Sequence, residues 1–263
     1  MNSGSNQHFL KDEFMWVNFA VEVNSNFDEI FFTQERREVF HFIAASSLVR
    51  LYVDFDFAKT LNKGHAICDS RIIEVLSWVL GSRIQRMRGA DFVRIFFTKI
   101  PVTGRHLFFG STPEVMESLI EKIEVMSTVV QEIDYVCPEF NVQVKNQAKE
   151  LIKEVTNRDL DYVWIAMGSP KQDYLANALR EHFGGGIFCV GAAVDFVSGC
   201  KSEAPTFFQF LGIEWLYRFA QEPRRLFVRY TLGNAQFISL FCKWVFGVRL
   251  LKRRDAEGQD GNP

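Results

Sequence analysis

Three glycine-containing turns have the residue types that bind anionic groups. Two share one order, an apolar run followed by Gly, a hydroxyl residue and Pro: Gly110-Ser-Thr-Pro113 and Gly168-Ser-Pro170. The third, Gly191-Ala-Ala-Val-Asp195, also follows an apolar run. A helix that begins at a strand end offers unpaired N–H groups and a positive dipole end, the usual physical basis of a phosphate site. One such turn is more typical of a well-capped helix, and none is a P-loop or a GxGxxG motif. Three in one chain favour a nucleotide ligand.

Polar side chains near these turns and near other element ends have two interpretations each. Asp69 precedes a helical pattern, so on its own it is most simply an N-cap. Ser169 and Gln172 have the spacing of a capping box, which alone would explain both residues. Asp195 could accept hydrogen bonds from ribose hydroxyls or could cap a helix or turn. A functional role for these residues needs a second line of argument.

The elements that would position these residues alternate between strand and helix patterns. Short β-branched or aromatic runs predict strands at Met15–Val23, Val49–Phe55, Val93–Thr98, Arg105–Phe109, Tyr162–Met167 and Gly186–Val190. Helical patterns lie between them, at Thr33–Ser46, Ile72–Leu80, Pro113–Ser127, Val142–Val155 and Pro170–His182. The alternation predicts an α/β fold with a doubly wound, mostly parallel sheet. Such sheets bind ligands at the carboxyl ends of their strands, where the three turns lie.

The composition is that of one large globular chain. Hydrophobic residues make up 48% of the 263 residues and charged residues 24%, which excludes a disordered or fibrous protein. Thirty Lys and Arg against 32 Asp and Glu give a net charge of −2, so the whole chain offers no electrostatic case for binding nucleic acid. The chain has 27 Phe, which we attribute to core packing rather than to an aromatic binding surface.

The cysteines and the first residues bear on the cellular compartment. The five cysteines include no CxxC pair and have no His at metal spacing, so we expect free thiols and no zinc site: Cys68, Cys137, Cys189, Cys200 and Cys242. Residues 1–14 lack the basic and apolar regions of a signal peptide, and we expect them to be flexible. These features predict a cytoplasmic protein.

The character of the chain changes after Ala204-Pro205. From Arg218 to the end there are nine Lys or Arg and four Asp or Glu, a balance of 9 − 4 = +5. An apolar stretch, Phe237–Val248, is interrupted by Lys243 and followed by the basic segment Arg249–Arg254. This pattern indicates an interfacial helix with basic flanks, or a C-terminal helix packed on the core. We therefore divide the chain into a domain at 15–204, a membrane-associating appendage at 205–254 and a disordered tail at 255–263.

An ordered set of motifs resembles the WecG/TagA/CpsF glycosyltransferases, glycosyltransferase family 26. The resemblance covers about Val17 to Tyr230 and is most specific from Gly168 onward. Its downstream motifs are Gly168-Ser-Pro-Lys-Gln-Asp173, Val190-Gly-Ala-Ala-Val-Asp-Phe-Val-Ser-Gly199, Ala204-Pro205, Gly212-Ile-Glu-Trp-Leu-Tyr-Arg218, Glu222-Pro-Arg-Arg225 and Arg229-Tyr230. Its upstream motifs are Ala66-Ile-Cys-Asp-Ser70 and Arg86-Met-Arg-Gly-Ala-Asp91.

The resemblance implies a Rossmann-like, inverting enzyme of bacterial cell-surface polysaccharide synthesis. Such enzymes move a sugar from a UDP-sugar donor to a polyprenyl-diphosphate-linked saccharide. The donor sugar is N-acetylmannosamine, its uronic acid, glucose or a related sugar, and no residue here separates them. The resemblance implies no cofactor and no metal. It also implies a peripheral position on the inner face of the plasma membrane, with an anionic membrane surface and a possible homo-oligomer as partners.

The resemblance also implies roles for individual residues. Asp69 would be the general base, since inversion by one displacement needs a carboxylate to deprotonate the attacking hydroxyl. The appendage would supply arginines whose forked guanidinium groups suit a diphosphate, and we count them as catalytic: Arg218, Arg225 and Arg229. The expected substrate-binding residues combine the glycine turns with polar side chains: Asp54, Arg86, Gly110, Gly168, Gln172, Gly191 and Asp195.

The chain departs from the family pattern at several positions. Ser70 stands where the family usually has Gly, Asp173 where it has Glu, and Ser202-Glu203 where an Arg commonly precedes Ala-Pro. Asp54 stands at the expected Asn of a Thr-x-Asn segment. These departures leave open a catalytically impaired nucleotide-sugar-binding protein or a scaffold of the polysaccharide assembly complex. A dehydrogenase is disfavoured, because the chain lacks GxGxxG and the ribose carboxylate at its spacing.

Overall fold

The strands form a single parallel sheet in the computed structural model, which describes residues 23–24, 38–44, 46–47, 50–51, 54–79, 84–100, 103–139 and 142–221. Within these ranges the sheet has seven strands in the order β1-β3-β2-β7-β6-β4-β5, and every pairing is parallel. The strands are β1 (Val23–Asn24), β2 (Val39–Ile43), β3 (His65–Cys68), β4 (Arg105–Gly110), β5 (Glu132–Val136), β6 (Tyr162–Ala166) and β7 (Gly186–Cys189). The predicted α/β, doubly wound class is confirmed.

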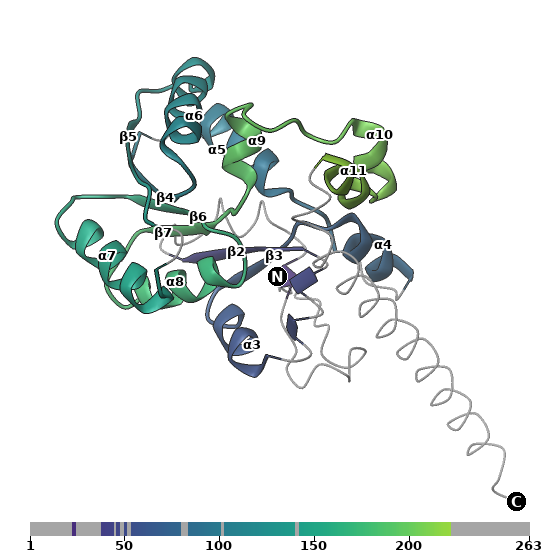
Figure 1. The fold of residues 1–263 in the computed structure, drawn as a ribbon, viewed down its shortest axis with the longest axis horizontal. Helices are drawn as coiled ribbons and strands as arrows, with labels where there is room; N and C mark the ends of the chain where they lie inside the picture. The colour runs from purple at the N-terminus through teal and green to yellow at the C-terminus, as the bar shows by residue number, and fades with distance from the viewer. Residues whose placement is uncertain are drawn as a thin grey trace, which may run out of the picture.

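Helices cover both faces of this sheet (Figure 1). One face carries α5 (Gly89–Lys99), α6 (Pro113–Met126) and α9 (Ala193–Val197), and the other carries α3 (Phe55–Leu61), α7 (Val144–Thr156) and α8 (Lys171–Leu179). The helices α4 (Arg71–Val79), α10 (Thr206–Leu211) and α11 (Glu214–Gln221) lie together at one side, where α10 contacts both of the others. Because helices cover both faces of the sheet, the loops that follow the strands form its carboxyl edge.

Phenylalanine and tryptophan fill the layer between the sheet and α5. Trp164 of β6 stacks on Phe108 at 5.4 Å and lies 4.4 Å from Phe188, measured between ring centroids. From α5, Phe92 and Phe96 pack on β6 and β7, with ring centroids 5.1 Å and 5.7 Å from that of Phe188. All five side chains are fully buried, and each contributes about 1.5–3 kcal/mol by leaving water. The prediction that phenylalanine serves core packing is confirmed for these residues.

The predicted strand at Val93–Thr98 is wrong, because these residues belong to α5. β-Propensity suggested a strand, whereas the apolar positions Val93, Phe96, Phe97 and Ile100 recur at i, i+3, i+4 and i+7. That spacing gives a helix one apolar face, and all four side chains are buried. Periodicity here outweighs the strand preference of aromatic residues.

The predicted helix at Thr33–Ser46 is also wrong at residues 39–43, which form β2. All five residues of β2 are buried between β3 and β7, so the strand lacks an alternating pattern. The predicted strand at Val49–Phe55 is wrong as well, since Arg50 and Leu51 are helical and α3 begins at Phe55. The predicted strand at 15–23 lies outside the described residues except for Val23.

Other predicted elements are confirmed, with small shifts at their ends. They are β4, β6 and β7 among the strands and α4, α6, α7 and α8 among the helices. Neither β3 nor β5 was predicted. Four cysteines, at 68, 137, 189 and 200, are free thiols, whereas Cys242 lies outside the described residues.

Candidate functional site

Asp69 lies at the carboxyl edge of the sheet, directly after β3. Its backbone N–H donates to the carbonyl of Ile43, the last residue of β2, at 3.0 Å. Its Oδ1 accepts the N–H of Gly89, the first residue of α5, at 3.3 Å. A carboxylate at a helix N-terminus interacts favourably with the helix dipole, and Asp69 has this position relative to α5. The residue proposed as base therefore stands where two strands and a helix meet.

Gln172 joins the turns after β6 and β7. Its Oε1 accepts the N–H of Gly168 at 3.1 Å, and its Nε2 donates to the carbonyl of Cys189 at 2.9 Å. Gly191, with φ of +57°, lies next to the side chain of Gln172: a Cβ added to Gly191 would be 3.2 Å from Gln172 Oε1. Gln172 is only 3% exposed. This arrangement replaces the predicted capping box, in which Gln172 would bond to the N–H of Ser169; contact of Gln172 with the donor stays a prediction.

The third turn lies beside the other two. Gly110 ends β4 with φ of +125°, and an added Cβ would lie 2.5 Å from the carbonyl oxygen of Ala166, at the end of β6. Only glycine can stand at position 110 without a shift of the backbone at Ala166. Helix α6 then begins at Pro113 as predicted, whereas α8 begins at Lys171, one residue later than predicted. The carboxyl ends of β4, β6 and β7 thus bring the three predicted turns to one edge (Figure 1).

A buried polar chain supports the turn at Gly168. His41 Nδ1 lies 2.7 Å from Asp173 Oδ1, and the hydroxyl of Ser169 donates to Asp173 Oδ2 at 2.6 Å. Cys189 is also adjacent, with the three possible ligand atoms of His41, Asp173 and Cys189 within 4.8 Å of one another. Burial raises the pKa of the Cys189 thiol well above its usual value.

The distance between His41 and Asp173 shows whether these three residues are spaced as the ligands of a zinc ion. Two ligand atoms of one tetrahedral zinc ion lie about 3.3 Å apart, given bond lengths of about 2 Å. The observed 2.7 Å is a hydrogen bond instead. Sequence reasoning missed this pair because His41 was assigned to a helix, and because 132 positions separate the two residues.

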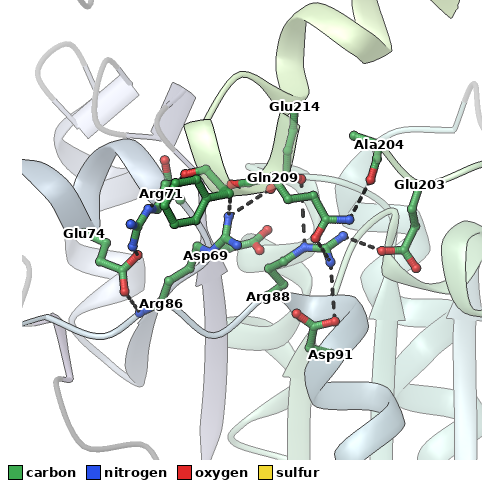
Figure 2. Close-up of polar contacts among 12 residues, drawn as sticks. Asp69, Arg71, Glu74, Arg86, Arg88, Asp91, Glu203, Ala204, Gln209 and Glu214 are labelled. Atoms are coloured by element: carbon green, nitrogen blue, oxygen red, sulfur yellow. Dashed lines mark hydrogen bonds and ion pairs between the residues drawn. The ribbon is translucent and has the colours of Figure 1, made fainter. Parts of the chain in front are cut away.

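Two arginines of the Arg86-Met-Arg-Gly-Ala-Asp91 motif turn toward α10 and α11 (Figure 2). Arg86 Nη1 donates to Glu214 Oε1 at 2.8 Å. Arg88 donates from Nη2 to Glu203 Oε2 at 2.6 Å and from Nη1 to Gln209 Oε1 at 2.8 Å. Arg86, which sequence reasoning assigned to substrate binding, is therefore engaged by a carboxylate of the same chain, and Arg88 was missed.

The contacts described for Asp54 and Asp195 are with residues other than Asp69. Asp54 caps α3, where its Oδ1 accepts the N–H of Phe57 at 3.0 Å and its Oδ2 accepts the hydroxyl of Tyr174 at 3.1 Å. Burial, and then this bond to Asp54, raise the pKa of Tyr174 to about 12. Asp195 lies on α9, with its Oδ2 3.5 Å from Lys201 Nζ.

The turn that directly follows β2 holds Ser46 and Ser47, not Asp54. The N–H of Ser47 donates to the carbonyl of Ala44 at 2.9 Å. The end of β2 also accepts the N–H of Asp69, so this turn shares the edge with the proposed base. The signal that could have found these serines is the apolar run of residues 39–43, once it is interpreted as a buried strand.

The remaining predicted site residues belong to the C-terminal part of the chain. Arg218 lies within α11, although its side chain is not among those described. Arg225, Arg229 and the segments at 237–254 lie outside the described residues. Among the helices that are described, none has the length and apolarity needed to cross a membrane.

A comparison with protein-family models identifies the family of the chain. The model described as "Glycosyl transferase WecG/TagA/CpsF family" matches residues 17–250. This range is far more than half of the chain. It contains the described sheet, all the helices around it and every residue that the sequence analysis assigned to the site.

Proposed function

Because the chain belongs to the WecG/TagA/CpsF glycosyltransferase family, whose members act in cell-surface polysaccharide synthesis, we propose that it is an inverting, UDP-sugar-dependent enzyme. The acceptor would be a hydroxyl of a polyprenyl-diphosphate-linked saccharide. The observation that carries the proposal is the position of Asp69. Its carboxylate stands at the carboxyl edge shared with the glycine turns, beside the arginines that contact α10 and α11.

The proposed reaction is a single displacement at the anomeric carbon. Asp69 accepts the proton of the acceptor hydroxyl while the new C–O bond forms and the bond to the UDP oxygen breaks. UDP departs with the electron pair of that bond. The N–H of Gly89 orients the carboxylate of Asp69 at 3.3 Å, so the base has a fixed direction before the acceptor arrives.

The diphosphate needs positive charge at the moment of departure. The turns at Gly168 and Gly191 are the proposed donor site, where backbone N–H groups at helix N-termini face the phosphates. Arg218, Arg225 and Arg229 are proposed to complete it with bidentate, charge-assisted hydrogen bonds, which would make a divalent ion unnecessary. Gln172 supports the donor site by tying Gly168 to β7.

The proposed location of the enzyme follows from the lipid that carries its acceptor. A lipid-linked acceptor requires the site to reach the membrane surface, and the basic balance of the C-terminal part suits anionic lipid. We place the enzyme on the inner face of the plasma membrane, attached through residues 237–254.

A panel of UDP-sugars offered with a short-chain lipid-linked acceptor tests the function. Mass detection of the product should show one hexose-type residue added to the acceptor and an equal amount of UDP released. Release of UDP without a glycosylated product would contradict the transferase assignment. Binding of UDP-sugars with neither product would instead support the impaired, sugar-nucleotide-binding alternative.

A further inference from the structure

Three arginines near Asp69 contact the segment at 203–221, which contains α10 and α11 and is called the α10–α11 arm below. Arg71 Nε donates to the carbonyl of Phe210 at 3.3 Å. Arg86 Nη1 donates to Glu214 at 2.8 Å, and Arg88 Nη1 donates to the amide oxygen of Gln209 at 2.8 Å. Figure 2 shows these side chains converging on the arm from around Asp69.

Arg88 is the most enclosed of the three. Its side chain is 8% exposed, and its Nη2 bonds to Glu203 Oε2 at 2.6 Å. Burial alone would lower the pKa of Arg88, but the bond to Glu203 and the nearby carboxylates raise it above its usual value. Gln209, the other partner of Arg88, donates from Nε2 to the carbonyl of Ala204 at 2.7 Å. One guanidinium thus holds both the start of the arm and α10.

The ion pairs around Arg88 contain equal numbers of positive and negative side chains. Arg86, Arg88 and Arg94 face the three carboxylates of Asp91, Glu203 and Glu214. Burial would raise the pKa of Glu203, but hydrogen bonds from Arg88 and Arg94 lower it, so Glu203 is ionised at neutral pH. Removing the carboxylate of Glu203 takes away the shortest ion pair of the largely buried Arg88 guanidinium and leaves the longer ones to Asp91 and Glu214, which costs more than the loss of an exposed ion pair.

We infer that Arg88 and Glu203 are a positioning pair that fixes the α10–α11 arm beside Asp69 and thereby sets the place of Arg218. Neither residue needs to touch a substrate for this role. The link to Arg218 rests on the proposed function, whereas the hold on the arm rests on the contacts alone. The pair acts through α10: Arg88 holds Gln209, and α11 follows after the left-handed turn at Gly212.

The substitution Glu203→Gln tests the hold on the arm without reference to activity. Amide hydrogen exchange in residues 206–221 should become about tenfold faster, while exchange in β6 stays unchanged, because only the arm loses its charge-assisted anchor. Arg94→Gln is the matched control. Arg94 pairs with the same Glu203 but is 37% exposed, and its described ion pairs are with Asp91 and Glu203, not with α10 or α11. This control should leave exchange in the arm within about twofold of the unmodified chain.

The activity of the same variants tests the link to the site. In Glu203→Gln, kcat for transfer to the lipid-linked acceptor should fall about tenfold, while KM for the UDP-sugar stays within about twofold. Glu203→Asp, which keeps the charge at shorter reach, should recover part of kcat, and Arg94→Gln should keep at least half.

The possible results separate the two parts of the inference from the proposed function. Unchanged exchange in the arm of Glu203→Gln would overturn the positioning pair. Faster exchange with full transfer activity would overturn its link to the site. If the unmodified chain transfers no sugar at all, the proposed function fails, and the exchange measurement still decides whether Arg88 and Glu203 hold the arm.

Discussion

Replacing Gln172 by Met should destabilise the folded chain and disturb the donor site together. The variant keeps the length of the side chain but removes both amide hydrogen bonds, to the N–H of Gly168 and to the carbonyl of Cys189. A buried polar group left without a partner costs about 1–3 kcal/mol, so the two contacts predict a loss of about 2–6 kcal/mol in the free energy of unfolding. Since Met is similar in size, a cavity adds little to this loss.

Urea unfolding followed by tryptophan fluorescence measures this loss, and transfer kinetics measure the effect on the site. KM for the UDP-sugar should rise because the turn at Gly168 loses its tie to β7. Gln143→Met is the matched control, since Gln143 is exposed before α7 and should change stability by less than about 0.5 kcal/mol. If Gln172→Met keeps full stability while KM rises, Gln172 acts by direct contact with the donor and the positioning argument is refuted.

Gln172→Glu sharpens the same prediction through pH. A protonated carboxyl group can still accept from Gly168 and donate to Cys189, whereas a carboxylate has no proton for the carbonyl. Burial and that carbonyl raise the pKa of the introduced group in the folded state above its unfolded value of about 4.3. Its stabilising contribution is therefore complete below about pH 4.3 and is lost as pH rises through the folded pKa. Relative to Gln143→Glu, stability should fall as pH increases.

Three further predictions concern the core, the diphosphate and the membrane. Burial lowers the pKa of His106 from 6.5 to about 4, so the contribution of His106 to the free energy of unfolding is complete above pH 6.5. About 3 kcal/mol of this free energy is lost as pH falls toward 4. Urea unfolding of His106→Gln should therefore show a flatter dependence of stability on pH than the unmodified chain. Transfer should persist in EDTA, and a strict Mg²⁺ or Mn²⁺ requirement would contradict the arginine-based diphosphate site. Truncation after Tyr230 should abolish flotation with anionic liposomes and reduce transfer to vesicle-borne acceptor more than to a soluble analogue; equal flotation of both forms would exclude attachment through residues 237–254.

Local sequence patterns were sufficient to predict the three glycine turns. Gly110 and Gly168 each follow a clear apolar run and precede a Pro near a helix start, so strand, turn and helix are all marked in the sequence. The rule that parallel sheets bind ligands at their carboxyl ends then predicted that these turns share an edge. The same rule located Asp69 at that edge only after β3 was known, because His65–Cys68 is too short to stand out in the sequence.

The supporting contacts could not be predicted in the same way. The partners Arg88 and Glu203 are 115 positions apart, and His41 and Asp173 are 132 apart, so no local pattern contains either pair. Strand β2 was missed because burial on both faces removes the alternation that identifies a strand. Without β2 inside the sheet, neither the contact of His41 with Asp173 nor the bond from the N–H of Asp69 to Ile43 could be inferred.

The central claim is that Asp69 is the base of a sugar transfer, and Asp69→Asn tests it most directly. The asparagine keeps the size of the side chain and an oxygen that can accept the N–H of Gly89, but it cannot take a proton from the acceptor. UDP binding, measured by calorimetry, should stay within about threefold of the unmodified chain, while turnover in the product assay falls at least about a hundredfold. Retention of full turnover by Asp69→Asn would remove Asp69 from the mechanism.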